Sequence, residues 1–167
     1  MPFETFLARR YLSGSHRVWG GRLTSFIAAG GIMDGRGVAA SLVLGAAGAM
    51  LGTAFLGCPE AGISDPYRQA LLQGQDDGTA LTTVFSGKPA RGLRNRFMDE
   101  MADAPIAPYP QQHTLTRDIR AAAAKANDQG LLSLWAGQGV GLMRSLPAGK
   151  LVGQLAEETA AALAGLQ

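Results

Sequence analysis

The segment from Gly37 to Pro59 contains no charged residue, and this feature limits the folds open to the chain more than any other. A charge-free run of this length can cross a bilayer as a helix, and Gly48 and Gly52 have the small-xxx-small spacing of packed membrane helices. The alternative is a segment buried inside a soluble domain. Many glycines and alanines, with few large aliphatic side chains, make transfer into lipid only weakly favourable. We therefore expect a buried segment.

Glycines divide this region into a strand, a helix and a second strand. Asp34, a residue type that caps helices, follows the first glycine pair. The expected elements are a strand over Ser25–Ala29, ending in Gly30-Gly31, a helix over Gly35–Leu44, and a buried strand over about Ala49–Phe55, whose apolar start is followed by Gly52-Thr53. Strands joined through a helix pair in parallel, and strands this apolar are normally covered on both faces. The predicted fold class is α/β.

The remainder of the chain is expected to be helical and loop-like. Capping residues, prolines and apolar stripes at helical spacing mark its segments. The expected helices are Tyr67–Gln73, Arg94–Met101, Thr116–Ala126 and Ala148–Leu163, with an extended linker through Pro105, Pro108 and Pro110. Because 47% of the 167 residues are hydrophobic and 17% are charged, the chain can bury a core and should form one domain.

The charge balance excludes some classes of partner. A formal charge of +2 gives no general attraction to nucleic acid or to anionic membranes. The densest basic group suits either a bound phosphate or a solvated, ion-paired face; its members are Lys88, Arg91, Arg94 and Arg96. The single cysteine, Cys58, can form neither an internal disulfide nor a cysteine metal cluster. We therefore expect a cytoplasmic protein with no nucleic-acid or membrane partner.

The clearest chemical signal is the glycine that follows each expected strand. Gly30-Gly31 and Gly52-Thr53 would lie side by side at the carboxyl-terminal edge of a parallel sheet. Backbone N–H groups with no Cβ beside them can surround a phosphate there, and Thr53 can add a hydroxyl donor. The alternative is that both are plain tight turns.

Other candidate motifs are weaker. Residues 137–141 superficially suggest a dinucleotide loop, but Leu142 stands at the third glycine position and no convincing strand precedes it. The two histidines, His16 and His113, have no second ligand at metal-binding spacing, so we expect no metal site. His16 is either a general base, since its ordinary pKa lies near neutrality, or a surface residue.

Four motifs, taken in order, resemble the carboxyl-terminal part of the nitronate monooxygenases, formerly called 2-nitropropane dioxygenases. They are Phe26-Ile-Ala-Ala-Gly-Gly-Ile-Met-Asp-Gly-Arg-Gly37, Leu51-Gly-Thr-Ala-Phe-Leu56, Phe85-Ser-Gly-Lys-Pro-Ala-Arg-Gly-Leu-Arg-Asn-Arg-Phe97 and Leu134-Trp-Ala-Gly-Gln-Gly139, with Pro108-Tyr-Pro110 between the last two. The first motif occurs in many flavin- and phosphate-binding barrels, whereas the four in sequence are specific. The similarity runs from about Phe26 to the C-terminal helix.

This resemblance implies a barrel of parallel strands that binds FMN, with the phosphate against the turns after the last two strands. By the resemblance, the cofactor contacts are Gly30, Gly31, Gly52 and Thr53. His16, in a loose echo of the family's histidine segment, is the catalytic candidate. The family reaction oxidises an alkyl nitronate with O2 to a carbonyl compound and nitrite, while the flavin carries the electrons. The expected small-molecule partners are therefore a nitronate and O2.

Only the last two strand-helix units of such a barrel are expected here, because a complete one has eight units and about 250 residues. We expect residues 1–24 to be unrelated or degenerate sequence, residues 25–57 to hold the two strands and the phosphate site, and residues 58–167 to be helical. The expected fold is thus a truncated TIM barrel with a C-terminal helical segment, a fragment of the family. The alternative is a non-catalytic partial barrel or degenerate product that needs a partner, either a second copy or a chain carrying the amino-terminal strands.

Overall fold

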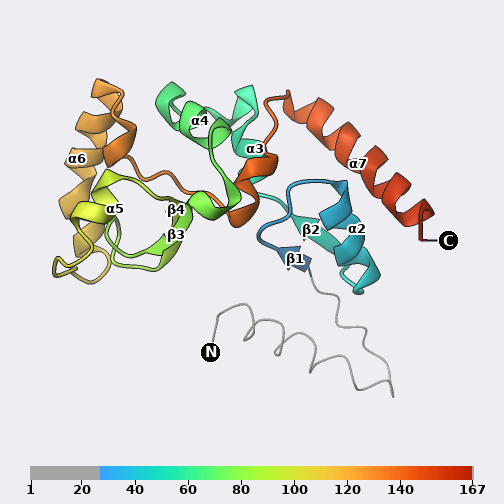
Figure 1. Ribbon diagram of the computed structural model, residues 1–167, viewed down its shortest axis with the longest axis horizontal. Coiled ribbons are helices and arrows are strands. Elements are labelled where there is room, and N and C mark those ends of the chain that lie inside the picture. The colour runs from blue at the N-terminus through green and yellow to red at the C-terminus, as the bar shows by residue number, and fades with distance from the viewer. Residues whose placement is uncertain (1–26, 167) are drawn as a thin grey trace, which may run out of the picture.

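Two short parallel strands begin the part of the chain that a computed structural model describes, residues 27–166 (Figure 1). β1 (Ile27–Ala29) and β2 (Gly48–Met50) pair in parallel, with Ile27 opposite Gly48 and Ala29 opposite Met50. The connection between them is α2 (Gly35–Val43). The Asp34 side chain accepts a hydrogen bond from the Gly37 N–H at 3.0 Å and so caps this helix. The predicted parallel strand-helix-strand unit is therefore confirmed.

The second strand is shorter and less buried than the sequence pattern predicts. It ends at Met50, and Thr53–Leu56 forms the short helix α3 instead of continuing the strand. The three residues of β1 offer no further pairing, and the turn at Gly52 buries Ala54 in a cluster at the start of α7. Met50 is 61% exposed. The prediction of a buried strand over Ala49–Phe55 is wrong in both length and burial.

An antiparallel hairpin interrupts the region that was expected to be helical. β3 (Thr79–Thr82) pairs with β4 (Ala90–Leu93), and β4 also bridges to Trp135 through Gly92. A Cβ atom at Gly92 would lie 2.7 Å from the Leu134 carbonyl oxygen, so the close approach of these two segments requires glycine. Pairing with β3 and this contact with the Leu134–Trp135 segment together make residues 90–93 a strand.

The remaining elements are helices and single turns. The helices are α4 (Asp65–Leu72), α5 (Arg96–Glu100), α6 (Gln111–Ala126) and α7 (Ala148–Ala164); the 3₁₀ turns are η1 (Pro59–Ala61), η2 (Asp76–Gly78), η3 (Gln129–Leu131) and η4 (Gln138–Leu142). α5 begins later than predicted because the Asn95 side chain accepts from the Met98 N–H and caps it. α6 begins before Thr116, directly after Pro110.

Three clusters of buried side chains hold these elements together. One joins α4 to the segment around Leu134 and Val140, one lies under the hairpin around Phe85 and Phe97, and the third packs Met33 and the α3 region against α7. In Figure 1 the strands β1 and β2 lie beside α2 and α7, the hairpin lies with α5 and α6 at the opposite end, and α3 and α4 lie between. No helix within residues 27–166 combines the length and apolar character needed to cross a membrane.

Candidate functional site at the glycine corners

Parallel pairing brings the ends of β1 and β2 to the same edge of the sheet. Ala29 pairs with Met50, so Gly30-Gly31 and Leu51-Gly52 leave the sheet together. We call the turns after the two strands the glycine corners. The first corner is Gly30-Gly31, and the second is Gly52-Thr53, which begins one residue after Leu51. Both corners face outward, since Gly30, Gly31 and Gly52 are exposed.

The first corner has a backbone that favours glycine and open space around it. Gly30 has φ +93° and Gly31 has φ +70°, which is the left-handed region that side chains with a Cβ rarely adopt. A Cβ atom built on Gly30, Gly31 or Gly52 would meet no other atom within 4 Å. Backbone conformation therefore favours glycine at Gly30 and Gly31, whereas Gly52, with φ −107°, adopts a conformation open to any residue. None of the three is required by internal crowding, and the space beside them is free for a ligand.

The side chain of Thr53 links the second corner to a distant loop. Its Oγ1 accepts a hydrogen bond from the Gly137 N–H at 2.9 Å. A Cβ atom on Gly137 would lie 3.4 Å from Thr53 Oγ1 and 3.7 Å from the Gly31 nitrogen. One glycine therefore contacts both corners, which places Gly31 and Thr53 close to one another. Among residues 27–166 the Thr53 hydroxyl proton and the Gly31 N–H have no acceptor, so both can donate to an anion.

The loop that closes this site belongs to a segment that sequence reasoning set aside. Gly139 packs so closely that an added Cβ would lie 2.7 Å from Met33 Cγ and 3.0 Å from the Gly31 carbonyl oxygen. The spacing of glycines over residues 137–141 was the available signal. It does not match a dinucleotide loop, but it does mark backbone that approaches other backbone closely.

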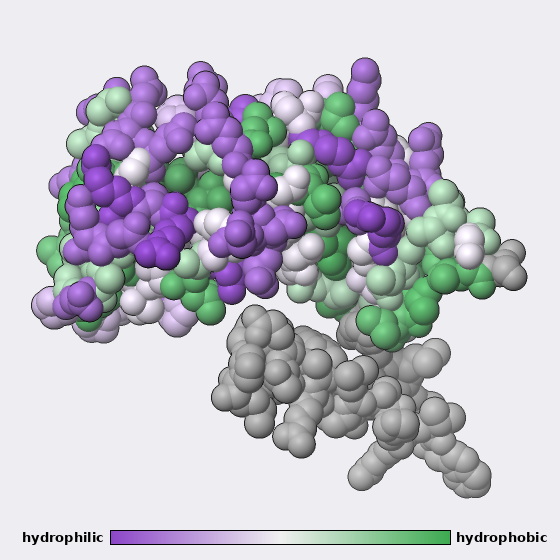
Figure 2. Space-filling view, viewed as in Figure 1, coloured by the Kyte–Doolittle hydropathy of each residue, from purple (hydrophilic) through white to green (hydrophobic). Residues whose placement is uncertain are grey.

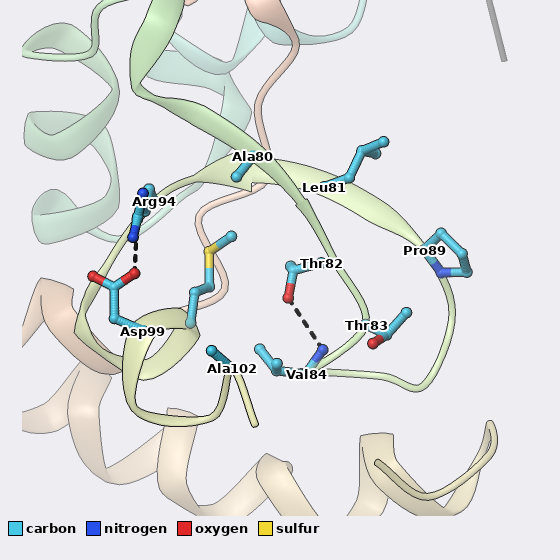
Figure 3. A pocket seen from close by; sticks show the side chains of 10 residues that line it. Ala80, Leu81, Thr82, Thr83, Val84, Pro89, Arg94, Asp99 and Ala102 are labelled. Atoms are coloured by element: carbon cyan, nitrogen blue, oxygen red, sulfur yellow. Dashed lines mark hydrogen bonds and ion pairs between the residues drawn. The ribbon is translucent and has the colours of Figure 1, made fainter. Parts of the chain in front are cut away.

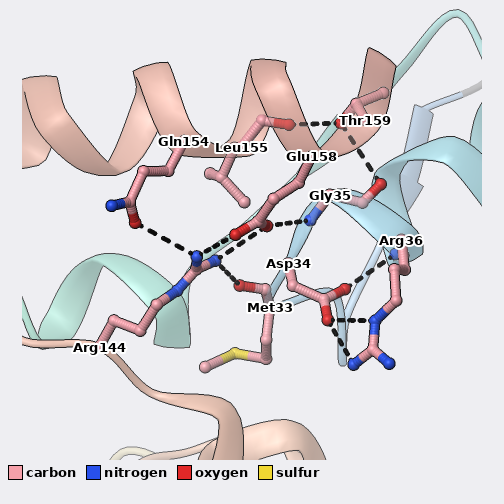
Figure 4. A network of polar contacts seen from close by, with 10 residues as sticks. Met33, Asp34, Gly35, Arg36, Arg144, Gln154, Leu155, Glu158 and Thr159 are labelled. Carbon is pink, nitrogen blue, oxygen red and sulfur yellow. Dashed lines mark hydrogen bonds and ion pairs between the residues drawn. The ribbon is translucent and has the colours of Figure 1, made fainter. Parts of the chain in front are cut away.

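Behind the first corner, a polar network joins α2 to α7 (Figure 4). The Glu158 carboxylate accepts from the Gly35 N–H at 2.9 Å and pairs with the Arg144 guanidinium. Arg144 also donates to the Met33 carbonyl at 3.2 Å. The hydrogen bond from Gly35, and then that from Arg144, lower the pKa of Glu158.

Asp34 lies at the start of α2, and its pKa is also lowered, but by a different set of interactions. Desolvation by partial burial raises its pKa, but hydrogen bonds from the Gly37 N–H and from Arg36 outweigh that effect and leave the pKa lowered. Because Asp34 and Glu158 already accept the Gly37 and Gly35 N–H groups, the start of α2 does not offer these donors to a ligand.

The basic group named from the sequence is dispersed in local contacts. Arg94 pairs with Asp99 at 2.7 Å and Arg96 with Asp128 at 2.7 Å. Lys88 lies 4.3 Å from the centre of the Tyr109 ring, and Arg91 donates to Thr79 across the hairpin. The structure therefore does not bring these four residues together around a phosphate and favours the ion-paired face.

A cavity of about 400 Å³ lies under the hairpin, away from the glycine corners (Figure 3). Ala80, Thr82 and Val84 line it from the β3 side, and the Arg94–Asp99 ion pair closes one end. None of its lining residues belongs to either corner, so it is separate from the candidate site.

Comparison with known proteins identifies the family of this chain. The family model for nitronate monooxygenase matches residues 25–158, which is most of the chain and includes both glycine corners, the loop over residues 137–141 and the Arg144–Glu158 pair. The chain belongs to the nitronate monooxygenase family.

Relatives and solved structures agree with this assignment. A probable nitronate monooxygenase from Staphylococcus aureus (strain Newman) is 46% identical over 131 residues, covering 77% of this chain and 37% of that protein. The nitroalkane oxidase structure from Streptomyces ansochromogenes has a TM-score of 0.82 at 48% identity, covering 86% of this chain and 41% of that one. FabK from Thermotoga maritima has a TM-score of 0.70 at 28% identity. The chain thus spans about two fifths of the length of the nitronate monooxygenase relatives it matches.

The residues predicted for a nitronate monooxygenase site fall into two groups. Gly30, Gly31, Gly52 and Thr53 lie within the described chain and are brought to one edge of the sheet. His16, the catalytic candidate, lies outside the described residues, as does the whole of the segment 1–24.

Proposed function

We propose that this chain carries the flavin-phosphate corner and the C-terminal segment of an FMN-dependent nitronate monooxygenase. The observation that carries the proposal is the meeting of two open glycine corners through Gly137. Beside them lie two donors with no acceptor among the described residues, the Gly31 N–H and the Thr53 hydroxyl proton. Family membership supports the same conclusion. We propose further that β1 and β2 are the last two strands of a parallel TIM-type barrel.

The residues present fit the phosphate group of FMN. Glycine lets an anion approach the backbone without meeting a Cβ, and the space beyond Gly30, Gly31 and Gly52 is open. The Thr53 hydroxyl, held by Gly137, can donate a charge-assisted hydrogen bond to a phosphate oxygen. These groups would fix the phosphate end of FMN and thereby orient the ring system.

The proposed reaction oxidises an alkyl nitronate with O2 to a carbonyl compound and nitrite. FMN, when bound, supplies the electron-accepting isoalloxazine for this chemistry. The chain's own contribution is to bind the phosphate and to exclude other orientations. We keep His16 as the proposed general base, because a histidine exchanges protons near neutral pH; the cytoplasmic location likewise stays a prediction.

The strands that would complete the barrel are proposed as the chief partner of this segment. Ile27 is 59% exposed and Met50 is 61% exposed, and such apolar side chains on a parallel sheet are normally covered. We propose that these faces pack against the remaining barrel strands, or against a second copy of this chain.

A non-catalytic role is the second candidate, and the same exposure favours it. A polypeptide that buries its strand faces only against a partner can bind FMN, or the partner, without turnover. Measured flavin binding and nitronate-dependent O2 consumption separate the two.

The test is a titration of the purified chain with FMN and with riboflavin, followed by flavin fluorescence, together with O2 consumption on an alkyl nitronate. The proposal expects FMN to bind more tightly than riboflavin, because only FMN carries the phosphate. If both flavins bind equally, or neither binds at high micromolar concentration, the assignment of the glycine corners to the FMN phosphate is wrong, and the enzyme proposal fails with it. Tight FMN binding without O2 consumption would favour the non-catalytic role.

A further inference from the structure

Arg144 contacts the segments that follow both strands. Its backbone carbonyl lies against Gly57, directly after α3, where an added Cβ would be 2.4 Å from that oxygen. Its side chain reaches the other segment and donates to the Met33 carbonyl at 3.2 Å. A single residue thus contacts the segments that follow the two glycine corners, at Met33 after the first and at Gly57 after the second.

Glu158 completes this connection from the C-terminal helix. Its carboxylate pairs with Arg144 and accepts from the Gly35 N–H at 2.9 Å. The neighbouring Thr159 hydroxyl lies 3.3 Å from the Gly35 carbonyl oxygen. Figure 4 shows Arg144 between Glu158 on α7 and the Met33–Gly35 turn. The side-chain exposures of 26% for Arg144 and 38% for Glu158 show that the pair is partly shielded from solvent.

The first glycine corner needs an anchor of this kind. Gly30 and Gly31 have the widest conformational freedom of any residue type, and both adopt positive φ. A Cβ at either position would meet no atom within 4 Å, so local packing on that side does not hold their shape. The loop that contains Gly137 and Gly139 packs against one side of Gly31. The side-chain hydrogen bonds that hold the turn come after it, at the Met33 carbonyl and the Gly35 N–H, from Arg144 and Glu158.

We propose that Arg144 and Glu158 are positioning residues that hold the first glycine corner in the shape that binds a phosphate group. The inference rests on the proposed function, since it assigns the corner to the FMN phosphate. No atom of either side chain lies within 4 Å of a Cβ built on Gly31; both act through the Met33 carbonyl and the Gly35 N–H. α7 is thereby coupled to cofactor affinity.

A purely structural role for the pair makes a different prediction. If Glu158 only attached α7, its loss would weaken α7 and leave the exchange of the corner amides and the preference for FMN over riboflavin unchanged. A positioning role changes these two readouts specifically, because glycine backbone that is released samples many conformations that do not direct the Gly31 N–H toward the phosphate.

The experiment uses the full chain with Glu158→Gln, and Glu157→Gln as the matched control, since Glu157 is the adjacent exposed carboxylate on α7. Hydrogen exchange of the amides over residues 30–35 is followed by mass spectrometry. FMN and riboflavin affinities are measured by fluorescence quenching. We expect about tenfold faster exchange and about tenfold weaker FMN binding for Glu158→Gln, with riboflavin binding unchanged, and no effect for Glu157→Gln.

Arg144→Lys is the second variant, used if circular dichroism shows that α7 unfolds in Glu158→Gln. Lysine retains the ion pair but cannot hold both Glu158 and the Met33 carbonyl with one planar group, so faster exchange at the corner is again expected. Unchanged exchange and unchanged FMN affinity in both variants would overturn the inference while leaving the proposed function intact. FMN binding no tighter than riboflavin in the wild type would instead defeat the proposed function, and the exchange rates would still decide whether the pair holds the corner.

Discussion

The glycines of this chain have two structural roles, which are distinguished by whether a Cβ atom would meet neighbouring atoms. At Gly30, Gly31 and Gly52 the space for a side chain is empty, whereas at Gly35 and Gly139 it is filled by neighbouring segments. The first kind leaves backbone N–H groups accessible, and the second kind lets segments pack at backbone distance. Substitution by alanine is therefore expected to affect ligand binding at one set and stability at the other.

Gly31→Ala tests the open kind. The positive φ of +70° costs alanine about 1–2 kcal/mol of stability, and its methyl group would project into the space assigned to the phosphate. We expect FMN binding to weaken by about tenfold or more, measured by fluorescence titration. Gly62→Ala is the control, since Gly62 has φ +63° and an equally open Cβ position outside the corners. A similar loss of FMN affinity in both variants would contradict the assignment.

Thr53→Val tests the hydroxyl donor. Removing a hydrogen bond to a charged group costs about 1.5–3 kcal/mol, so FMN affinity should fall by roughly ten- to a hundredfold. Thr53→Ser keeps the hydroxyl that Gly137 orients and should bind FMN nearly as well as the wild type. If valine at this position leaves the FMN dissociation constant unchanged, Thr53 is not a phosphate contact.

The ionised Glu158 predicts a dependence of stability on pH. Its pKa in the folded chain lies below the ordinary value of 4.5 because of its hydrogen bonds to Gly35 and Arg144. A lowered folded pKa contributes stability that is complete above the unfolded pKa and is lost as the pH falls through the folded pKa. The difference in unfolding free energy between wild type and Glu158→Gln should therefore shrink as the pH falls below about 4.5. Urea unfolding at several pH values measures it, and a difference that stays constant with pH would contradict the role of the charge.

At the scale of elements, the main contact is that of α2 with α7, which packs the last helix of the described chain against the first. Gly35 makes this possible, because a Cβ there would lie 2.3 Å from Glu158 Cβ and 2.5 Å from the Thr159 nitrogen. Met33, Leu151 and Leu155 bury the apolar side of the same junction. α7 is thus attached both by packing and by the polar network described above.

Gly35→Ala should force α2 and α7 apart and lower the free energy of unfolding by about 1–3 kcal/mol. Gly153→Ala, on α7 itself, is the matched control, because its Cβ would meet nothing within 4 Å. There alanine should raise stability by up to about 1 kcal/mol through its higher helix propensity. Urea unfolding, monitored by circular dichroism, measures the change in unfolding free energy, which should be a loss for Gly35→Ala and a gain for Gly153→Ala. Equal changes in both variants would contradict the close contact at Gly35.

At the scale of the whole molecule, apolar side chains remain uncovered where β1, β2 and the end of α2 meet. Ile27, Val43, Leu44 and Met50 are each more than half exposed. Figure 2 shows hydrophobic residues gathered on this side of the molecule, over α2, while the hairpin and α6 present a more hydrophilic surface. Exposed apolar patches of this kind are typical of interaction surfaces, which is the basis of the partner proposed above.

Replacing Ile27 and Met50 together by threonine and glutamine should weaken association of the chain with itself or with added barrel strands. Each square ångström of apolar surface buried contributes about 25 cal/mol, so loss of two central side chains should shift association to higher protein concentration. Sedimentation velocity measures this shift. Leu115→Gln on α6, where Leu115 is 67% exposed, is the control, and an equal shift in both would show that the patch has no special role.

Several features of the fold were predictable because they depend on local backbone chemistry. Glycines after apolar runs mark turns, and Asp34 before Gly35 marks a helix start, so the parallel unit and the turns after its two strands followed from residue order. The hairpin of β3 and β4 was missed because its strands are short and carry no clear alternation of apolar residues. The length of β2 was misjudged because an apolar run does not distinguish strand from buried helix at Thr53–Leu56.

Residue order therefore determined the turns after β1 and β2 and the start of α2, since those properties are local to a few neighbouring residues. Tertiary structure alone decided that Gly137 joins the two corners, that Gly139 packs on Met33, and that Arg144 and Glu158 hold the Met33–Gly35 turn. These contacts join residues separated by 84 to 123 positions, and no local pattern encodes a partner at that distance. Their geometry depends on how α7 and the loop before it pack against the parallel strands.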